Sequence, residues 1–122
     1  MKSEALEATE AECADGRTAP RVSLTDIEDA ILYQLYCTGS EMGSMFLEGT
    51  KHMRPFAELT SHLTICLLVL KNGFTVVGKS APASKDNFDP VLGRKLAYED
   101  AVRQIWPLMG FALRDRLHRG GA

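Results

Sequence analysis

The stretch SHLTICLLVLKNGFTVVGKSA, residues 61–81, decides the fold. Two aliphatic and β-branched runs flank Asn72-Gly73. An Asn-Gly pair in this setting is the strongest short-range signal of a β-hairpin, because a two-residue type I′ turn needs positive φ at both positions. The expected cross-strand pairs are Val69 with Val76, Leu67 with Gly78, Leu68 with Val77, and Leu70 with Thr75. The stretch predicts an antiparallel hairpin that is apolar on both faces.

A hairpin with two apolar faces needs cover on both of them. A small antiparallel sheet normally leaves one face in water, with polar side chains on that side. The second face of this hairpin is therefore expected to be covered by a helix or by another subunit. The sequence predicts a homodimer or larger homo-oligomer.

Part of the same stretch, GFTVVGKS (residues 73–80), matches the phosphate-loop pattern G-x-x-x-x-G-K-[ST]. A genuine phosphate loop follows a strand and opens a helix at its Lys-Ser pair. Here the four intervening residues form a strand of the hairpin, and two prolines in the next ten residues prevent a helix from starting at Ser80. The match is therefore interpreted as accidental.

Helical patterns lie on both sides of the hairpin. In residues 23–36, Leu24, Ile27, Ile31 and Leu35 recur at helical spacing and predict a first helix over about 24–36. After the hairpin, Asp89-Pro90 predicts a helix start, with the cap residue directly before a first-position proline. The residues expected to face inward from this second helical region are Leu92, Leu96, Val102, Ile105, Trp106, Leu108, Phe111, Ala112 and Leu117. Pro107 is expected to break or kink it into a helix pair.

The remaining segments carry weaker patterns. Residues 1–20 are acidic, lack a long apolar stripe and predict a flexible tail. Residues 37–60 mix glycine, serine, methionine and charge, and predict a variable, loop-rich segment with a short strand around 45–47 as an alternative. The expected organisation is one α+β domain over 21–119: an N-terminal helix, a small hairpin-based antiparallel sheet, and a kinked C-terminal helix pair packed on it.

Composition narrows the functional classes. The chain has 122 residues, a net charge of −2, 45% hydrophobic residues and three cysteines with no C-x-x-C pair. It carries no signal-peptide pattern and no apolar run long enough to span a membrane. The region from Lys79 onward is only mildly basic, so nucleic-acid binding is not expected. The composition predicts a reduced, intracellular protein without a disulfide framework.

No residue pattern indicates catalysis. His52, His62 and His118 are far apart and have no carboxylates at ligand spacing, so no metal site is predicted. Ser80 has no evident base beside it, and the acidic residues near the last helix are explained as caps and solvated charges. The sequence therefore predicts a protein that is not an enzyme and carries no cofactor.

One cluster is compatible with ligand binding. Phe88 lies beside the predicted start of a helix, where backbone N–H groups and the helix dipole favour anions. An aromatic ring that stacks on a base, together with guanidinium groups that bind phosphate, can hold a nucleotide without hydrolysing it. The candidate ligand-binding residues are Asn87, Phe88, Arg94, Lys95, Arg114 and Arg116. The alternative is that Phe88 fastens the loop to the core and that the basic residues are surface charges.

The chain resembles a family of small tailed-phage proteins of the phage Sf6 type over about 23–36 and 63–117. The shared pattern is NGF-x-V-x-G-x-SA, then NFD, then G-R-K-x-A-x-x-x-A and I-W-x-L-x-G-[FY]. In this chain the pattern falls on Asn72–Phe74, Val76, Gly78, Ser80–Ala81, Asn87–Asp89, Gly93–Lys95, Ala97, Ala101, Ile105–Trp106, Leu108 and Gly110–Phe111. The segment between the first helix and the hairpin is longer here than in the family pattern, and residues 1–20 are an addition to it.

The resemblance implies a setting, the infection of a bacterium, rather than a reaction. The first expected function is counter-defence or host takeover in the cytoplasm of the infected host, by sequestering a small anionic, nucleotide-type signal. The second is a protein-interaction module that inhibits a host defence protein through the methionine-rich segment 42–53 and the acidic tail. Methionine suits such adaptable contacts because its side chain is flexible and polarizable.

Overall fold

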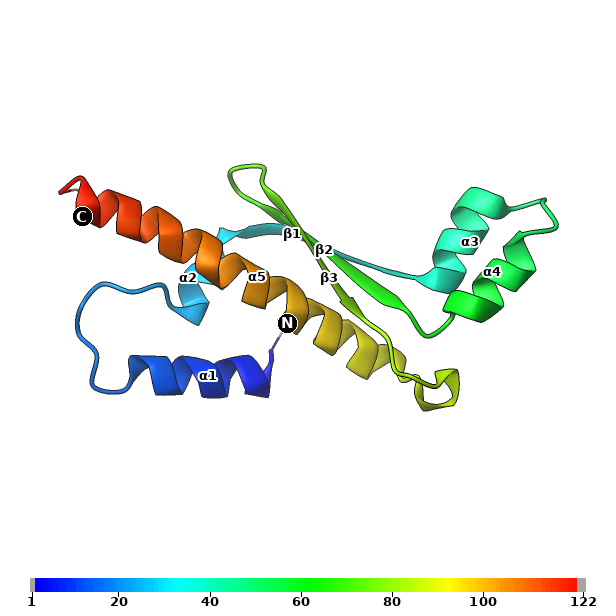
Figure 1. Ribbon diagram of the computed structural model, residues 1–122, viewed down its shortest axis with the longest axis horizontal. Helices are drawn as coiled ribbons and strands as arrows, with labels where there is room; N and C mark the ends of the chain where they lie inside the picture. Colours follow the sequence, from blue (N-terminus) through cyan, green and yellow to red (C-terminus); the bar gives the residue numbers. More distant parts are fainter. Residues whose placement is uncertain (1, 121–122) are drawn as a thin grey trace.

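The computed structural model describes residues 2–120 and has an α+β architecture. Three antiparallel strands form one sheet in the order β1-β2-β3, with β1 at Ile31–Thr38, β2 at Thr64–Leu70 and β3 at Thr75–Ser80. The long helix α5, Pro90–His118, crosses one face of this sheet (Figure 1). The shorter helices are α1 at Glu4–Ala14, α2 at Leu24–Ala30, α3 at Gly39–Leu47 and α4 at Met53–Thr60.

The hairpin is present, but its turn and register differ from the expectation by one residue. The observed pairs include Leu68 with Val76 and Leu67 with Val77. The turn has three residues, Lys71 to Gly73, because Gly73 donates to the Leu70 carbonyl and Leu70 donates to the Phe74 carbonyl. Within this turn, only Gly73 has a positive φ, of 89°. This is the three-residue loop in which a type I turn is followed by one left-handed glycine.

The predicted first helix is wrong beyond Ala30. Residues 31–38, ILYQLYCT, form β1, which pairs antiparallel with β2. Helix α2 is short and begins with a capping box between Ser23 and Asp26. The β-branched and aromatic residues after Ala30 fit a strand as well as they fit a helical stripe, and pairing with the apolar β2 favours the strand.

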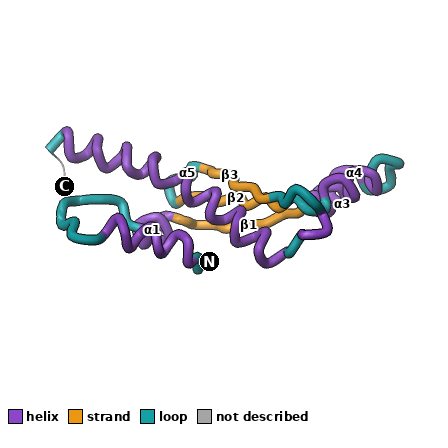
Figure 2. Tube along the Cα trace, turned by 60° about the horizontal axis from the view of Figure 1, so that its bottom comes forward, coloured by secondary structure: helices purple, strands orange, loops and turns teal. Residues whose placement is uncertain are grey.

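The prediction of a loop-rich segment over residues 37–60 is also wrong, because residues 39–60 fold into two helices. Helices α3 and α4 form a helical hairpin that projects beyond one end of the sheet, between β1 and β2 (Figures 1 and 2). A Cβ on Gly43 would contact the ring of Phe56 at 3.2 Å, so the missing side chain lets the two helices pack closely. We call residues 39–60 the α3–α4 lobe.

Helix α5 packs on the sheet through small side chains rather than through the expected leucines. Its buried residues are Gly93, Ala97, Tyr98, Glu99, Ala101, Val102 and Ile105. Leu92, Leu96, Leu108, Phe111 and Leu117 are exposed, and Trp106 is half-buried. Gly93, Ala97 and Ala101 recur every fourth residue and let the helix backbone approach the sheet. The helix also continues through Pro107, so a single helix replaces the expected pair.

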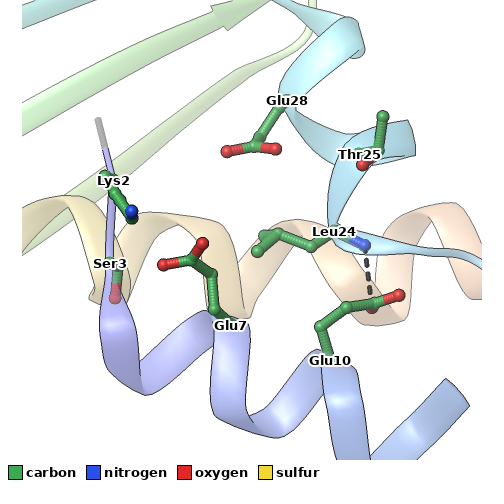
Figure 3. Close-up of a pocket in the computed structure, with 7 residues that line it drawn as sticks. All are labelled: Lys2, Ser3, Glu7, Glu10, Leu24, Thr25 and Glu28. Atoms are coloured by element: carbon green, nitrogen blue, oxygen red, sulfur yellow. Dashed lines mark hydrogen bonds between the residues drawn. The ribbon is translucent and has the colours of Figure 1, made fainter.

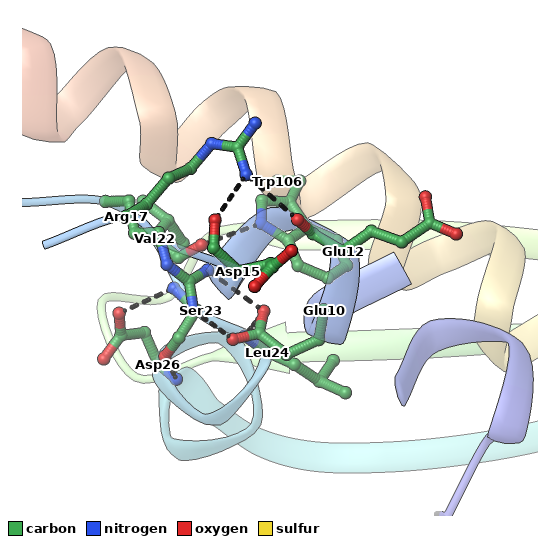
Figure 4. Close-up of polar contacts among 10 residues, drawn as sticks. Glu10, Glu12, Asp15, Arg17, Val22, Ser23, Leu24, Asp26 and Trp106 are labelled. Atoms are coloured by element: carbon green, nitrogen blue, oxygen red, sulfur yellow. Dashed lines mark hydrogen bonds and ion pairs between the residues drawn. The ribbon is translucent and has the colours of Figure 1, made fainter. Parts of the chain in front are cut away.

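The N-terminal segment is not the expected flexible tail but contains helix α1. Leu6 is buried in the core, and the hydroxyl of the buried Ser3 donates a hydrogen bond to the carboxylate of Glu99, which is itself buried in α5. Glu10 accepts hydrogen bonds from Arg21 and, at 2.9 Å, from the backbone N–H of Leu24 (Figure 4). A few specific polar contacts fix this helix, and composition alone does not reveal them.

The Glu10 contacts predict an acid-sensitive attachment of α1. The hydrogen bond from Arg21 lowers the pKa of Glu10 below its ordinary value of 4.5. A lowered pKa in the folded state stabilises the fold above the ordinary pKa, and this contribution is lost as the pH falls through the lowered value. We expect the protection factors of the α1 amides, which correct for the intrinsic slowing of exchange in acid, to fall as the pH drops below 4.5. Glu10→Gln should remove this pH dependence, while Glu12→Gln should keep it.

Candidate functional site

The structure separates the six predicted ligand-binding residues into two groups. Asn87, Phe88, Arg94 and Lys95 lie at the start of α5, and Arg114 and Arg116 lie near its end. Arg94 and Arg114 are separated by about 30 Å, because each residue adds 1.5 Å to a helix. The six side chains are therefore not brought together in one chain.

Asn87 and Phe88 line a cavity of about 120 Å³, together with residues of β3 and the first turns of α5. Drug-sized ligands usually occupy about 300 Å³ or more. The Phe88 ring lies against Gly93, where an added Cβ would meet it at 3.2 Å. Phe88 therefore fastens the loop to the helix, and Arg94 and Lys95 do not line the cavity.

The start of α5 is already capped by a carboxylate. Asp89 accepts hydrogen bonds from the backbone N–H groups of Val91 at 2.9 Å and Leu92 at 3.3 Å. These are donors that an anion would otherwise bind at a helix start. A negative charge at this position also repels a phosphate. The geometry gives no support to an anion site at this helix terminus.

The larger hollows include two that lie between helices. A cleft of about 490 Å³ separates α1 from α2, and Glu7, Glu10 and Glu28 are among the residues that line it (Figure 3). A second cavity of about 330 Å³ lies between α2 and the end of α5 and contains Arg116 beside Asp26 and Asp29. Both contain carboxylates, which do not suit a nucleotide. Within residues 2–120, no group of three or more His, Cys, Asp or Glu side chains is arranged to hold a metal ion.

Burial disfavours the deprotonated, reactive forms of two thiols and one tyrosine hydroxyl. Burial raises the pKa of the Cys66 thiol in the core and the pKa of the half-buried Cys37 thiol in β1. Burial also raises the pKa of the Tyr98 hydroxyl to about 12. A thiol acts as a nucleophile through its thiolate, and a raised pKa reduces the thiolate fraction at neutral pH.

The most prominent surface features are apolar. On the α3–α4 lobe, Met45, Phe46 and Leu59 are exposed, with 75% of Phe46 and 76% of Leu59 open to solvent. On the sheet face that points away from α5, Tyr33, Leu35 and Val77 are more than half exposed. We call this second surface the open sheet face. Large exposed apolar patches mark interaction sites in soluble proteins.

A protein-family profile matches the part of the chain that forms α2, the sheet, the α3–α4 lobe and nearly all of α5. Residues 22–117 match the profile of the phage protein (N4 Gp49/phage Sf6 gene 66) family. The chain belongs to the N4 Gp49/phage Sf6 gene 66 family. No curated protein and no solved structure matches the chain. The family match includes the α3–α4 lobe and begins after α1, so this family member carries α1 as an N-terminal element outside the matched region.

The sequence reasoning missed the lobe as a folded surface of this family member. The signal was present: Thr38 and Glu41 have capping-box spacing, and both hydrogen bonds of the box form at the start of α3. Pro55 lies in the first turn of α4, where proline is tolerated. No helix in residues 2–120 is both long and apolar enough to cross a bilayer.

Proposed function

We propose that this phage protein acts by binding rather than by catalysis, and that its ligand is a bacterial host protein contacted by the α3–α4 lobe. In this proposal the protein serves host takeover or counter-defence in the cytoplasm of the infected cell by inhibiting that host protein. The observation that carries the proposal is the exposure of Met45, Phe46 and Leu59 on a lobe that projects from the sheet. Aromatic residues and methionine are enriched in protein interfaces.

The lobe suits binding because it is held in shape before a partner arrives. Gly39 lies against the backbone of Thr60, and Gly43 lies against Phe56, so α3 and α4 pack directly on each other. The hydroxyl of Thr38 and the carboxylate of Glu41 fix the start of α3. A preformed surface loses little conformational entropy on binding. The acidic segment 1–20, by contrast, is used within the fold and is no longer proposed as part of the interface.

A charge placed on the lobe is expected to remove partner binding. Phe46→Glu should weaken binding to a purified host partner by at least about tenfold, because a carboxylate would be desolvated at the centre of an apolar contact. Phe111→Glu is the matched control, since Phe111 has the same 75% exposure but lies near the end of α5. The partner is first identified by co-purification from infected cells. Titration calorimetry with the two purified proteins then measures the effect.

Equal losses in the two variants would contradict the lobe as the contact surface. Unchanged binding of Phe46→Glu would do the same. Both variants are expected to keep the fold, because both side chains are exposed. A far-ultraviolet circular dichroism spectrum that matches the wild type checks this for each variant.

The second function expected from the sequence, sequestration of a nucleotide-type signal, is not favoured by the geometry, because the cavity lined by Asn87 and Phe88 measures only about 120 Å³ and no basic side chain within residues 2–120 lines it. Calorimetry with linear and cyclic nucleotides tests this function. Binding without turnover that Asn87→Ala and Arg94→Glu abolish, and that Arg114→Ala leaves intact, would support a site at the start of α5. The absence of binding to every nucleotide would remove this candidate and leave the protein-binding proposal standing.

A further inference from the structure

The two outer edges of the sheet are treated differently by the rest of the chain. At the β3 edge, the Asp100 carboxylate accepts a hydrogen bond from the backbone N–H of Lys79 at 2.9 Å. The Gln104 side chain donates to the Val77 carbonyl at 2.8 Å. Side chains of α5 thus take one outward backbone group of Lys79 and one of Val77, so an additional strand could not form a complete ladder there. We call this edge the closed β3 edge.

The β1 edge is open. The backbone N–H of Lys71 bonds to the Ala30 carbonyl, and the N–H of Gly39 bonds to the Leu63 carbonyl. With this register, Tyr33, Leu35 and Cys37 direct their backbone groups toward β2, while Gln34 and Tyr36 direct theirs outward. Within residues 2–120, these outward groups have no hydrogen-bond partner. The next outward N–H, that of Thr38, is taken by Glu41.

Apart from one bulge at its start, β1 lacks the devices that usually protect an edge strand. Residues 31–38, ILYQLYCT, contain no charge and no proline. Natural sheets blunt their edges with lysine, proline, short strands or covering elements. Here the only irregularity is the bulge between Ile31 and Tyr33, which leaves residues 33–38 in regular pairing with β2. An eight-residue uncharged edge beside an exposed apolar face is suited to pairing with another strand.

We propose that β1 pairs antiparallel with β1 of a second copy of this chain, around a two-fold axis at Leu35. In this register Gln34 faces the partner's Tyr36, and Tyr36 faces the partner's Gln34. The outward N–H and carbonyl groups of both residues then form hydrogen bonds across the axis. The exposed Leu35 side chains meet across the axis, where strand Cα atoms approach to about 4.5 Å. An uncharged strand meets its own copy without repulsion, so the contact is self-complementary.

The pairing also makes one continuous surface from two. Each three-stranded open sheet face covers roughly 300 Å², from strand spacings of about 4.8 Å and about 3.4 Å per residue. Joining them gives a six-stranded sheet whose apolar band crosses the axis and covers part of the exposed surface of Tyr33 and Leu35. This inference does not depend on the proposed function, because it concerns self-association alone.

Hydrogen exchange on the full-length chain tests the edge directly. Sedimentation should give twice the mass of the 13.4 kDa chain, falling toward that of a single chain on dilution. In the dimer, the Gln34 and Tyr36 amides should exchange at least about tenfold more slowly than in diluted protein. The Tyr33 and Leu35 amides are internal controls, because they bond to β2 in either state. A monomer at all concentrations, or unprotected Gln34 and Tyr36 amides in a dimer, would overturn the proposal.

Cross-linking tests the register. In a background that carries Cys13→Ser and Cys37→Ser, Leu35→Cys should form an intermolecular disulfide under mild oxidation, since the expected Cα separation fits disulfide geometry. Val77→Cys is the matched control, because Val77 lies on the same open sheet face and is half exposed but belongs to the closed β3 edge. Efficient cross-linking at Val77, with none at Leu35, would instead indicate face-to-face packing and reject edge pairing.

Discussion

Gly78→Val is expected to be strongly destabilising, lowering the free energy of unfolding by about 3 kcal/mol. A Cβ at this position would lie closer than 3.0 Å to the Ala97 carbonyl and 2.5 Å from the Ala101 amide nitrogen, both of which are backbone atoms of α5. Backbone cannot rotate away as a flexible side chain can. The valine must therefore push α5 off the sheet, and urea unfolding followed by circular dichroism measures the loss.

Gly110→Ala is the matched control for this prediction. Gly110 also belongs to α5, but a Cβ there would meet nothing within 4 Å. Because alanine is favoured over glycine inside a helix, this change should raise stability by up to about 1 kcal/mol. A Gly78→Val variant with wild-type stability would show that α5 and β3 are not in close contact in solution.

Leu68→Ala is expected to cost about 3 kcal/mol, within the range observed for buried leucines. Leu68 is 0% exposed at the centre of β2, on the face that packs against α5. Truncation removes apolar burial and leaves a cavity that the neighbouring strands and α5 cannot fill, because the small residues of α5 already bring its backbone close to the sheet. Thermal and urea unfolding should both report the loss.

Leu35→Ala gives the corresponding measurement on the opposite face. Leu35 is 57% exposed, so at low protein concentration its truncation should cost less than about 1 kcal/mol. Similar losses in Leu35→Ala and Leu68→Ala under dilute conditions would contradict the observed assignment of faces. At high concentration the cost of Leu35→Ala should grow, because the dimer contact proposed above then contributes.

The parts of the fold that could be predicted have local signals. Asn72-Gly73 between two apolar runs marked the hairpin, and Asp89-Pro90 marked the start of α5. The predicted two-residue turn was wrong, because the observed three-residue loop needs positive φ at Gly73 alone. The longer loop shifts every cross-strand pair of β2 and β3 by one residue. A one-residue change in register exchanges the two faces of a strand. Leu68 and Val76 are therefore buried neighbours across the strands.

The parts that could not be predicted depend on long-range contacts. The end of α2 at Ala30 depends on pairing between β1 and β2, which are separated by the whole lobe. The buried stripe of α5 uses Gly93, Ala97 and Ala101, and their value lies in close approach rather than in hydrophobicity. Helix α1 is attached through Ser3, whose partner Glu99 lies 96 residues away. Local periodicity contains none of this information.

For the candidate site, sequence reasoning predicted residue types better than it predicted proximity. Asn87 and Phe88 do share a cavity, as expected of a loop that precedes a helix. Arg114 and Arg116 were grouped with them on charge alone, and helix length separates the groups. In the methionine-rich segment 42–53, Met45 and Phe46 are exposed while Met42 and Met53 are half-buried, and all four lie on helices rather than on a loop.

The closed β3 edge has a consequence for the solution behaviour of the protein. Asp100 occupies the backbone N–H of Lys79 and Gln104 occupies the carbonyl of Val77, so a strand that joins at β1 leaves only a partly blocked edge on the opposite side. Growth by strand addition is therefore expected to end after one event rather than to extend into a fibril. Replacing Asp100 and Gln104 together with alanine would free that edge and convert a self-limiting pair into a polymerising protein.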